Sequence, residues 1–172
     1  MPTLKTLYPS TSTLDLTLTL AGLATNASGV FLAGQASTAV DNTTNLDIDH
    51  LLSGVIVVGS VAPTVSRSIN IYAYAPISVA AGVPTYPDSI TGTNAAKTMT
   101  SANVMNSSIR AFVASITIDA TASRAYSFTP VSIASLFGGV LPKFWGVFVA
   151  HDTAQALTSG TLSYERIQGQ TV

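Results

Sequence analysis

Apolar and polar residues alternate along much of this chain, with the period of two that is typical of β-strands. The clearest example is TLDLTLTLAG at residues 13–22, where four leucines fall on one face and polar residues on the other. A slip of one residue would expose all four leucines, so the pairing of this segment should be strongly fixed. Seven further segments have strand character: 30–34, 51–59, 68–77, 109–119, 125–131, 144–152 and 161–167.

Two of these segments have apolar residues on both faces. In SINIYAYAPI (68–77), isoleucines and alanines share one face, and Tyr72 and Tyr74 share the other. IRAFVASITID (109–119) is apolar on both faces throughout, which predicts a strand in the centre of a sheet.

Clusters of Gly, Pro, Asn and Ser separate the predicted strands. One short helix is predicted at residues 132–137, with Ser132 as its cap and two glycines after it. Residues 79–108 form a long, weakly patterned connection, which we expect to cross between sheets or to make a contact. About eight strands without a repeat or a linker predict an all-β fold, a single jelly-roll-like β-sandwich over residues 13–172.

Residues 1–12, MPTLKTLYPSTS, show no strand alternation. Their prolines fix φ and remove hydrogen-bond donors, which favours an extended arm over a sheet strand. The arm carries Leu4, Leu7 and Tyr8, which are costly to leave in water. We expect it to dock on a partner molecule; alternatively, it folds back over the end of its own core.

Composition narrows the function classes. Charged residues make up 9% of the chain, against about 25% in an ordinary soluble domain, which is typical of a subunit held in an assembly. A net charge of −1 with scattered Lys and Arg does not predict nucleic-acid binding. The absence of Cys excludes disulfides, thiolate zinc sites and Cys nucleophiles. Without an 18-residue apolar run or a signal-peptide core, we expect no membrane segment and synthesis in a cytoplasm.

LPKFWGVFVAHDTAQALTSG (141–160) contains the single Trp of the chain and the neighbouring residues His151 and Asp152. On an extended backbone, adjacent side chains point to opposite faces, which is poor geometry for a catalytic pair. We therefore interpret these two residues as the polar end of a strand at the rim of a sheet. Nucleophile-elbow and phosphate-loop motifs are absent from the sequence, so we expect no catalytic residues, no cofactor and no enzymatic activity.

The segment NLDIDHLL (45–52) is the candidate for a metal site. Asp47 and Asp49 lie two residues apart, so a strand would aim both carboxylates the same way, with Asp41 upstream. Hard oxygen ligands suit calcium, but the spacing of an EF-hand loop is missing. The alternatives are an Asp-rich turn with a solvent-facing strand start, or a helix N-terminus at which Asp47 favours the dipole.

Five apolar or aromatic residues are the candidate contacts with a partner. Tyr72 and Tyr74 share a strand face, from which they would stack on sugars or, as we favour, pack in a core or a subunit interface. The other three are the arm residues Leu4, Leu7 and Tyr8.

Two passages carry a family resemblance. VSIASLFGGVLPKFWGVFVAHDTAQAL (131–157), which follows AYSF at 125–128, resembles small virion proteins of tailed bacteriophages. GQASTAVDNTTNLDIDHLLSGVI (34–56) is also similar to these proteins in its S-T-A-x-D-N-T-x-N pattern. Together the two passages cover less than a third of the chain.

The resemblance implies a structural role in a virion. With the composition, it leads us to expect a capsid decoration or cement protein that binds and stabilises the assembled head. Its expected partners are the major capsid protein, or other virion subunits, and further copies of itself, three being the expected number. The alternatives are a tail or neck subunit, such as a tail-tube or head-completion protein, or a carbohydrate-binding β-sandwich module.

Overall fold

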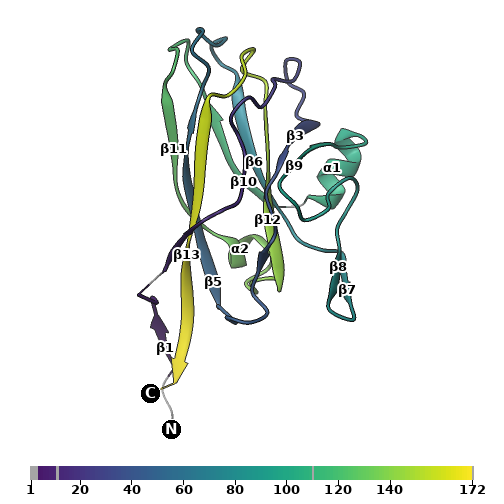
Figure 1. The fold of residues 1–172 in the computed structure, drawn as a ribbon, viewed down its shortest axis with the longest axis vertical. Coiled ribbons are helices and arrows are strands. Elements are labelled where there is room, and N and C mark those ends of the chain that lie inside the picture. The colour runs from purple at the N-terminus through teal and green to yellow at the C-terminus, as the bar shows by residue number, and fades with distance from the viewer. Residues whose placement is uncertain (1–3, 11, 110, 172) are drawn as a thin grey trace.

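Antiparallel strands dominate the computed structural model, which describes residues 4–10, 12–109 and 111–171 (Figure 1). The strands are β1 (Leu4–Leu7), β2 (Thr13–Asp15), β3 (Ala33–Ala36), β4 (Val40–Asp41), β5 (Asp49–Val57), β6 (Ser68–Tyr74), β7 (Ser78–Ala80), β8 (Val83–Thr85), β9 (Ala95–Thr98), β10 (Ala111–Thr117), β11 (Ala125–Ser132), β12 (Phe144–His151) and β13 (Ser159–Thr171). The described helices are α1 (Ala102–Ser108) and α2 (Ile133–Leu136).

Eight of these strands form four nested antiparallel pairs: β2 with β13, β3 with β12, β5 with β11 and β6 with β10. Taken in this order, the four pairs alternate between two sheets. The first sheet contains β2-β13-β5-β11, and the second contains β10-β6-β12-β3. A long hairpin of nested pairs rolled into two facing sheets is a jelly roll. The predicted all-β jelly-roll sandwich is confirmed, and each of the eight predicted strand segments overlaps one of the eight strands.

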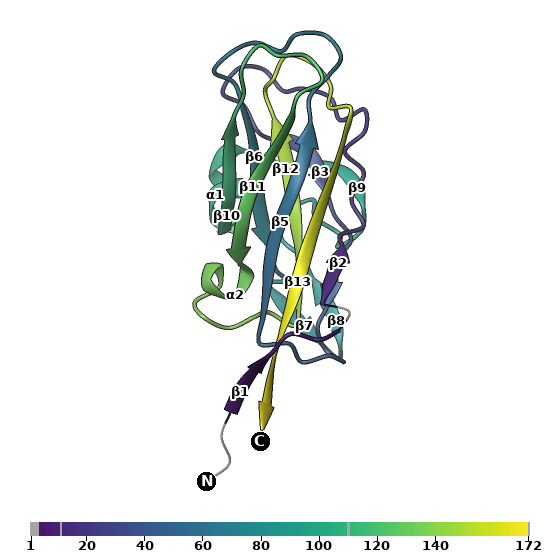
Figure 2. The same cartoon turned by 90° about the vertical axis from the view of Figure 1, so that its left-hand side faces the viewer.

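The main core lies between the two sheets, which Figure 2 shows with the first sheet toward the viewer. Inward-facing residues of both sheets meet there, including Ile56, Ile71, Val147 and Leu162, all fully buried. Strand β12 is central in the second sheet, between β6 and β3, and its apolar residues are buried on both faces.

The leucine-rich segment at residues 13–22 is a strand only at β2, which corrects the prediction of a longer one. Its backbone then crosses between the sheets. The Leu16 N–H donates to Leu162 O of β13 over 2.8 Å, whereas Thr17 O accepts from Thr38 N–H, beyond β3, over 2.9 Å. Leu16 and Leu20 are buried as the alternation predicts and close one side of the sandwich, whereas Leu14 is exposed and Leu18 is half-buried.

Strand β10 is at the edge of its sheet, so the prediction that it is central is wrong. Its apolar residues on both faces have another cause. The register with β6 shifts between Phe112 and Ala114, which is a β-bulge. The bulge changes which alternate residues face inward, so that Val113, Ile116 and Ile118 are all buried.

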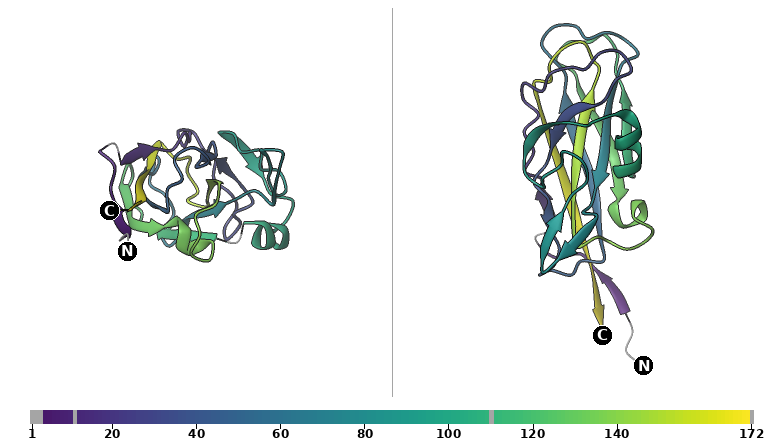
Figure 3. Two further views of the ribbon diagram at one scale, coloured as in Figure 1. Left: turned by 90° about the horizontal axis from the view of Figure 1, so that it is seen from below. Right: turned by 90° about the vertical axis from the view of Figure 1, so that its right-hand side faces the viewer.

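The connection over residues 79–108 stays on one sheet, so of the two alternatives given for it the crossing between sheets is wrong. It leaves β6, forms the β7–β8 hairpin, adds β9 to the far edge beside β3, and returns through α1 to β10. The right-hand view of Figure 3 shows this segment in front of the second sheet. It builds a second core over that sheet, in which α1 contributes Met105.

The chain ends form a ribbon that extends from the lower end of the sandwich in Figures 1 and 2. β13 pairs with β5 only up to Ile167, and its residues 168–171 pair with β1 on the other side. We call this pair, residues 4–7 and 168–171, the terminal ribbon. At about 3.3 Å per residue, it extends roughly 13 Å past the end of β5. The arm is therefore partly a sheet strand, which corrects the prediction; its residues 1–3 and 11 lie outside the described residues.

Candidate functional site

A buried polar cluster lies where the terminal ribbon joins the sandwich. Asp47, just before β5, accepts hydrogen bonds from Arg166 Nε at 2.8 Å, Arg166 Nη2 at 3.1 Å and Gln168 Nε2 at 2.8 Å. His50 of β5 lies 2.9 Å from Asp47 through Nε2. On its other side, His50 Nδ1 accepts from the indole N–H of Trp145 over 2.9 Å. The cluster thus joins β5, β12 and the outer part of β13.

These contacts specify the ionisation of the cluster. His50 is almost fully buried, and burial lowers its pKa below 6.5 despite the neighbouring Asp47. A neutral ring with its proton on Nε2 satisfies both contacts of His50. Burial alone would raise the pKa of Asp47, but hydrogen bonds from Arg166, His50 and Gln168 hold that pKa below its usual value. The cluster is therefore an Asp47–Arg166 ion pair beside a neutral imidazole.

The hydrogen-bonded series Asp47–His50–Trp145 resembles the arrangement of a catalytic triad, but an indole takes the place of the nucleophile. Trp145 donates to the nitrogen that would otherwise take a proton from a nucleophile. Both Trp145 and His50 are buried, and Tyr164 stacks against His50 with ring centroids 4.6 Å apart. Through Arg166 and Gln168, the cluster holds β13 in place at the base of the terminal ribbon.

His151 and Asp152 lie at the opposite end of β12, and each has its own partners. His151 Nε2 donates to Leu23 O over 3.0 Å, and Nδ1 lies 3.0 Å from the Thr153 hydroxyl. Asp152 accepts from the backbone N–H groups of Gly29 and Ser68, both at 2.8 Å.

This strand end is polar and lies where β12 ends, as predicted, and its side chains are buried. Its role in the structure is to tie surrounding loops to β12. The prediction that His151 and Asp152 carry no catalysis remains a prediction.

The structure does not bring Asp47 and Asp49 to one metal position. The Asp49 carboxylate accepts from the Ser132 hydroxyl at 2.6 Å and from Ala134 N–H at 2.8 Å, at the start of α2. Asp41 closes a turn with Thr43. The expected common orientation is wrong because β5 begins only at Asp49, so Asp47 lies before the strand and turns toward Arg166. The helix-terminus role that was an alternative for Asp47 belongs to Asp49, which accepts from Ala134 N–H.

The tyrosines predicted as partner contacts are in the second core. Tyr72 is 9% exposed and Tyr74 is fully buried, with its hydroxyl donating to Ser37 O over 2.7 Å. The connection that follows β6 covers them, so their proposed contact with a partner is corrected to internal packing. Leu7 and Tyr8 are exposed, at 39% and 54%, whereas the side chain of Leu4 lies outside the described residues.

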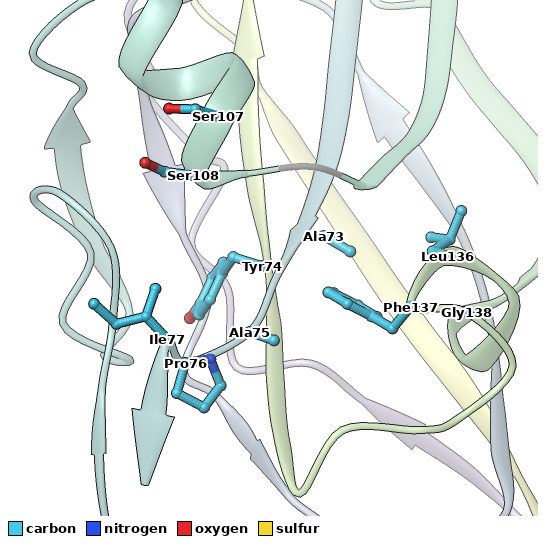
Figure 4. Close-up of a pocket in the computed structure, with 10 residues that line it drawn as sticks. All are labelled: Ala73, Tyr74, Ala75, Pro76, Ile77, Ser107, Ser108, Leu136, Phe137 and Gly138. Atoms are coloured by element: carbon cyan, nitrogen blue, oxygen red, sulfur yellow. The ribbon is translucent and has the colours of Figure 1, made fainter.

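An uncharged groove of about 680 Å³ lies beside the β7–β8 hairpin (Figure 4). Its walls are residues 73–77 at the end of β6, Ser107 and Ser108 at the end of α1, and residues 136–138 after α2. Ile77, Phe137 and the ring of Tyr74 are among the side chains that line it, and none of its lining residues is charged. The groove combines residues from three separate segments of the chain, so no local pattern in the sequence indicated it.

The buried histidines make stability depend on pH. Burial lowers the pKa of His50 and of His151, so the unfolded chain binds protons first as the pH falls below about 6.5. The two neutral histidines make their full contribution to folding stability above that pH. This contribution is lost as the pH falls through their lowered pKa values. The lowered pKa values of Asp47 and Asp152 add a second loss below about pH 4.

Urea denaturation between about pH 7.5 and about pH 3 should therefore give midpoints that fall in two steps. A constant midpoint down to about pH 5 would contradict neutral buried histidines.

These observations define the chain as an all-β protein of jelly-roll topology with a terminal ribbon. No family model and no curated protein matches its sequence. In the part of the chain that the structure describes, no helix is long and apolar enough to cross a lipid bilayer.

Proposed function

We propose that this protein is a structural subunit of a bacteriophage virion, a decoration or cement protein of the assembled head. The observation that carries the proposal is the terminal ribbon. A two-stranded ribbon is at best marginally stable in water. A ribbon that extends past its own sandwich, with exposed Leu7 at its base and exposed Tyr8 directly after it, suits a protein that docks on a neighbour.

The polar residues that suggested chemistry support the same proposal. The carboxylates and imidazoles of Asp47, His50, His151 and Asp152 are all buried and held by internal partners. Their arrangement suits rigidity rather than turnover, so we propose a non-enzymatic role. A decoration protein stabilises the head because it binds the assembled lattice and so favours that state by mass action.

We further propose that the protein acts as an oligomer of three copies in contact with the major capsid protein. Low charge and exposed apolar residues at the lower end of the sandwich support self-association. A tail or neck subunit would have the same properties. The carbohydrate-binding alternative loses its specific support, because Tyr72 and Tyr74 are buried and do not offer a stacking surface.

Binding to empty heads tests the proposal. We expect the full-length protein to bind heads that lack it, saturably and with a fixed number of copies per head, in a sedimentation assay. A variant without residues 1–10 should lose this binding, because it lacks β1 of the terminal ribbon.

The truncated variant should keep a cooperative melting curve close to that of the full chain, since β1 pairs only with β13. Unfolding on truncation would mean that the arm is part of the core. Failure of the full-length protein to bind heads would contradict the decoration role and favour the tail or neck.

A further inference from the structure

Two elements at the lower end of the molecule lack the packing that would make them stable alone. The first is the terminal ribbon, whose β1 strand is the outermost strand of its sheet. The second is the β7–β8 hairpin, with three residues in each strand and a two-stranded sheet of its own. Isolated two-stranded elements of this size gain too little burial to hold their shape in water.

The hairpin exposes apolar side chains that its own chain leaves uncovered. Ile77 is 70% exposed and Val83 is 66% exposed, and Val79 is also exposed. Ile77 forms one wall of the uncharged groove, with Phe137 on the opposite side (Figure 4). The exposed β-branched side chains at the rim of this uncharged groove form a surface against which an aromatic or leucine anchor can be buried.

The ribbon offers anchors of matching chemistry. Leu7 and Tyr8 are exposed at its base, and Lys5 is the only charged residue of the described segment 4–10. The outer edge of β1 also leaves backbone donors and acceptors without a strand partner, as do the outer edges of the hairpin. Such edges pair readily with one another by strand addition.

The placement of the two elements excludes the same chain as the occupant of its own groove. In Figure 1 the ribbon lies at the lower left and the hairpin at the lower right. The view from below in Figure 3 again places the chain ends on the opposite side from the hairpin. No ribbon residue lines the groove.

We propose that the terminal ribbon of one copy docks against the β7–β8 hairpin of a second copy, with Leu7 and Tyr8 entering the groove beside Ile77 and Phe137. The two surfaces differ, so the contact is heterologous. It gives a closed ring where the rotation between successive copies closes, as the proposed three-copy oligomer requires, and an open filament where it does not. This names the segment and the partner through which the protein associates with itself. The contact does not require a phage head.

Disulfide trapping tests the contact directly, because the chain has no Cys of its own. Leu7→Cys and Ile77→Cys are made in separate proteins, both at exposed positions, and the two are mixed under mild oxidation. We expect a crosslinked species that contains one copy of each protein. Leu7→Cys mixed with Val61→Cys is the matched control, because Val61 is equally exposed in the β5–β6 loop at the opposite end.

A second measurement does not depend on crosslinking. Ile77→Asp together with Val83→Asp should shift the mass in light scattering from an oligomer to the 17.7 kDa monomer, whereas Val61→Asp should not. Melting curves show whether each variant is folded. Three outcomes would overturn the proposal: equal trapping with Val61→Cys, trapping only between two Leu7→Cys chains, or a wild-type protein that is already a monomer.

Head binding is measured separately, so the two proposals can fail independently. Trapping without head binding would leave the ribbon contact intact and remove the virion role. Head binding by a monomeric protein would support the virion role and overturn the ribbon contact.

Discussion

Replacing Asp47 with Ala is expected to lower the free energy of unfolding by about 3–5 kcal/mol. Asp47 is the common acceptor for Arg166, Gln168 and His50, and its side chain is 1% exposed. Removing it leaves a mostly buried guanidinium without its counter-charge and two further donors without a partner. Urea denaturation at neutral pH, with the slope compared between variants, measures the effect.

Asp15→Ala is the matched control for this substitution. Asp15 is exposed in β2 and accepts one hydrogen bond, from the Ser163 hydroxyl of β13 at 2.6 Å. Its loss should cost about 1 kcal/mol or less. Similar costs for the two substitutions would contradict the structural role of the cluster.

A double-mutant cycle separates the charge pair from its surroundings. Adding Arg166→Met to Asp47→Ala removes the unpaired charge, so the second substitution should cost less than Arg166→Met alone. We expect a coupling energy of about 0.5–3 kcal/mol between the two sites. If the losses of unfolding free energy for the two substitutions simply add, the contribution of Arg166 to stability does not depend on Asp47.

Replacing Gly146 with Ala is expected to cost about 1–3 kcal/mol, although Ala suits a strand better than Gly. Gly146 lies in β12 opposite Tyr74 of β6, and a β-carbon there would overlap the phenol ring of Tyr74. The ring has no room to move, because Tyr74 is fully buried and its hydroxyl is bonded to Ser37 O. Urea denaturation again gives the loss.

The background variant Tyr74→Ala distinguishes this overlap from a general effect of Gly146→Ala. Without the ring, the added methyl group has space, so Gly146→Ala should be nearly neutral in that background. An unchanged cost would show that the contact with Tyr74 is not the cause.

Short-range patterns were enough to locate the eight strands of the four nested pairs, because the period of two indicates which residues face a core. They did not predict β1, β4, β7, β8 or β9. The same patterns predicted the short helix after Ser132, whose hydroxyl accepts from Ser135 N–H at 3.0 Å. Alternation also separated the faces of β6, with Ile69 and Ile71 in the main core and Tyr72 and Tyr74 in the second.

Features that depend on distant residues were not predicted. The bulge in β10 and its position at an edge depend on pairing with β6, which no local pattern in residues 109–119 encodes. The second core required the 79–108 connection to fold back over one sheet, and its residues have no regular period. The cluster at Asp47 combines β5, β12 and β13, separated by as many as 121 positions between Asp47 and Gln168.

The sequence by itself therefore determined the all-β class, the approximate positions of the eight strands of the nested pairs and the faces of a regular strand such as β6, because these follow from local periodicity and turn residues. Only the tertiary structure decided that Tyr72 and Tyr74 are internal, that Asp47 pairs with Arg166 rather than sharing a site with Asp49, and that β1 joins β13 in a ribbon. Each of these depends on which distant strand lies beside a residue. That choice is made by the packing of the whole sandwich rather than by neighbours along the chain.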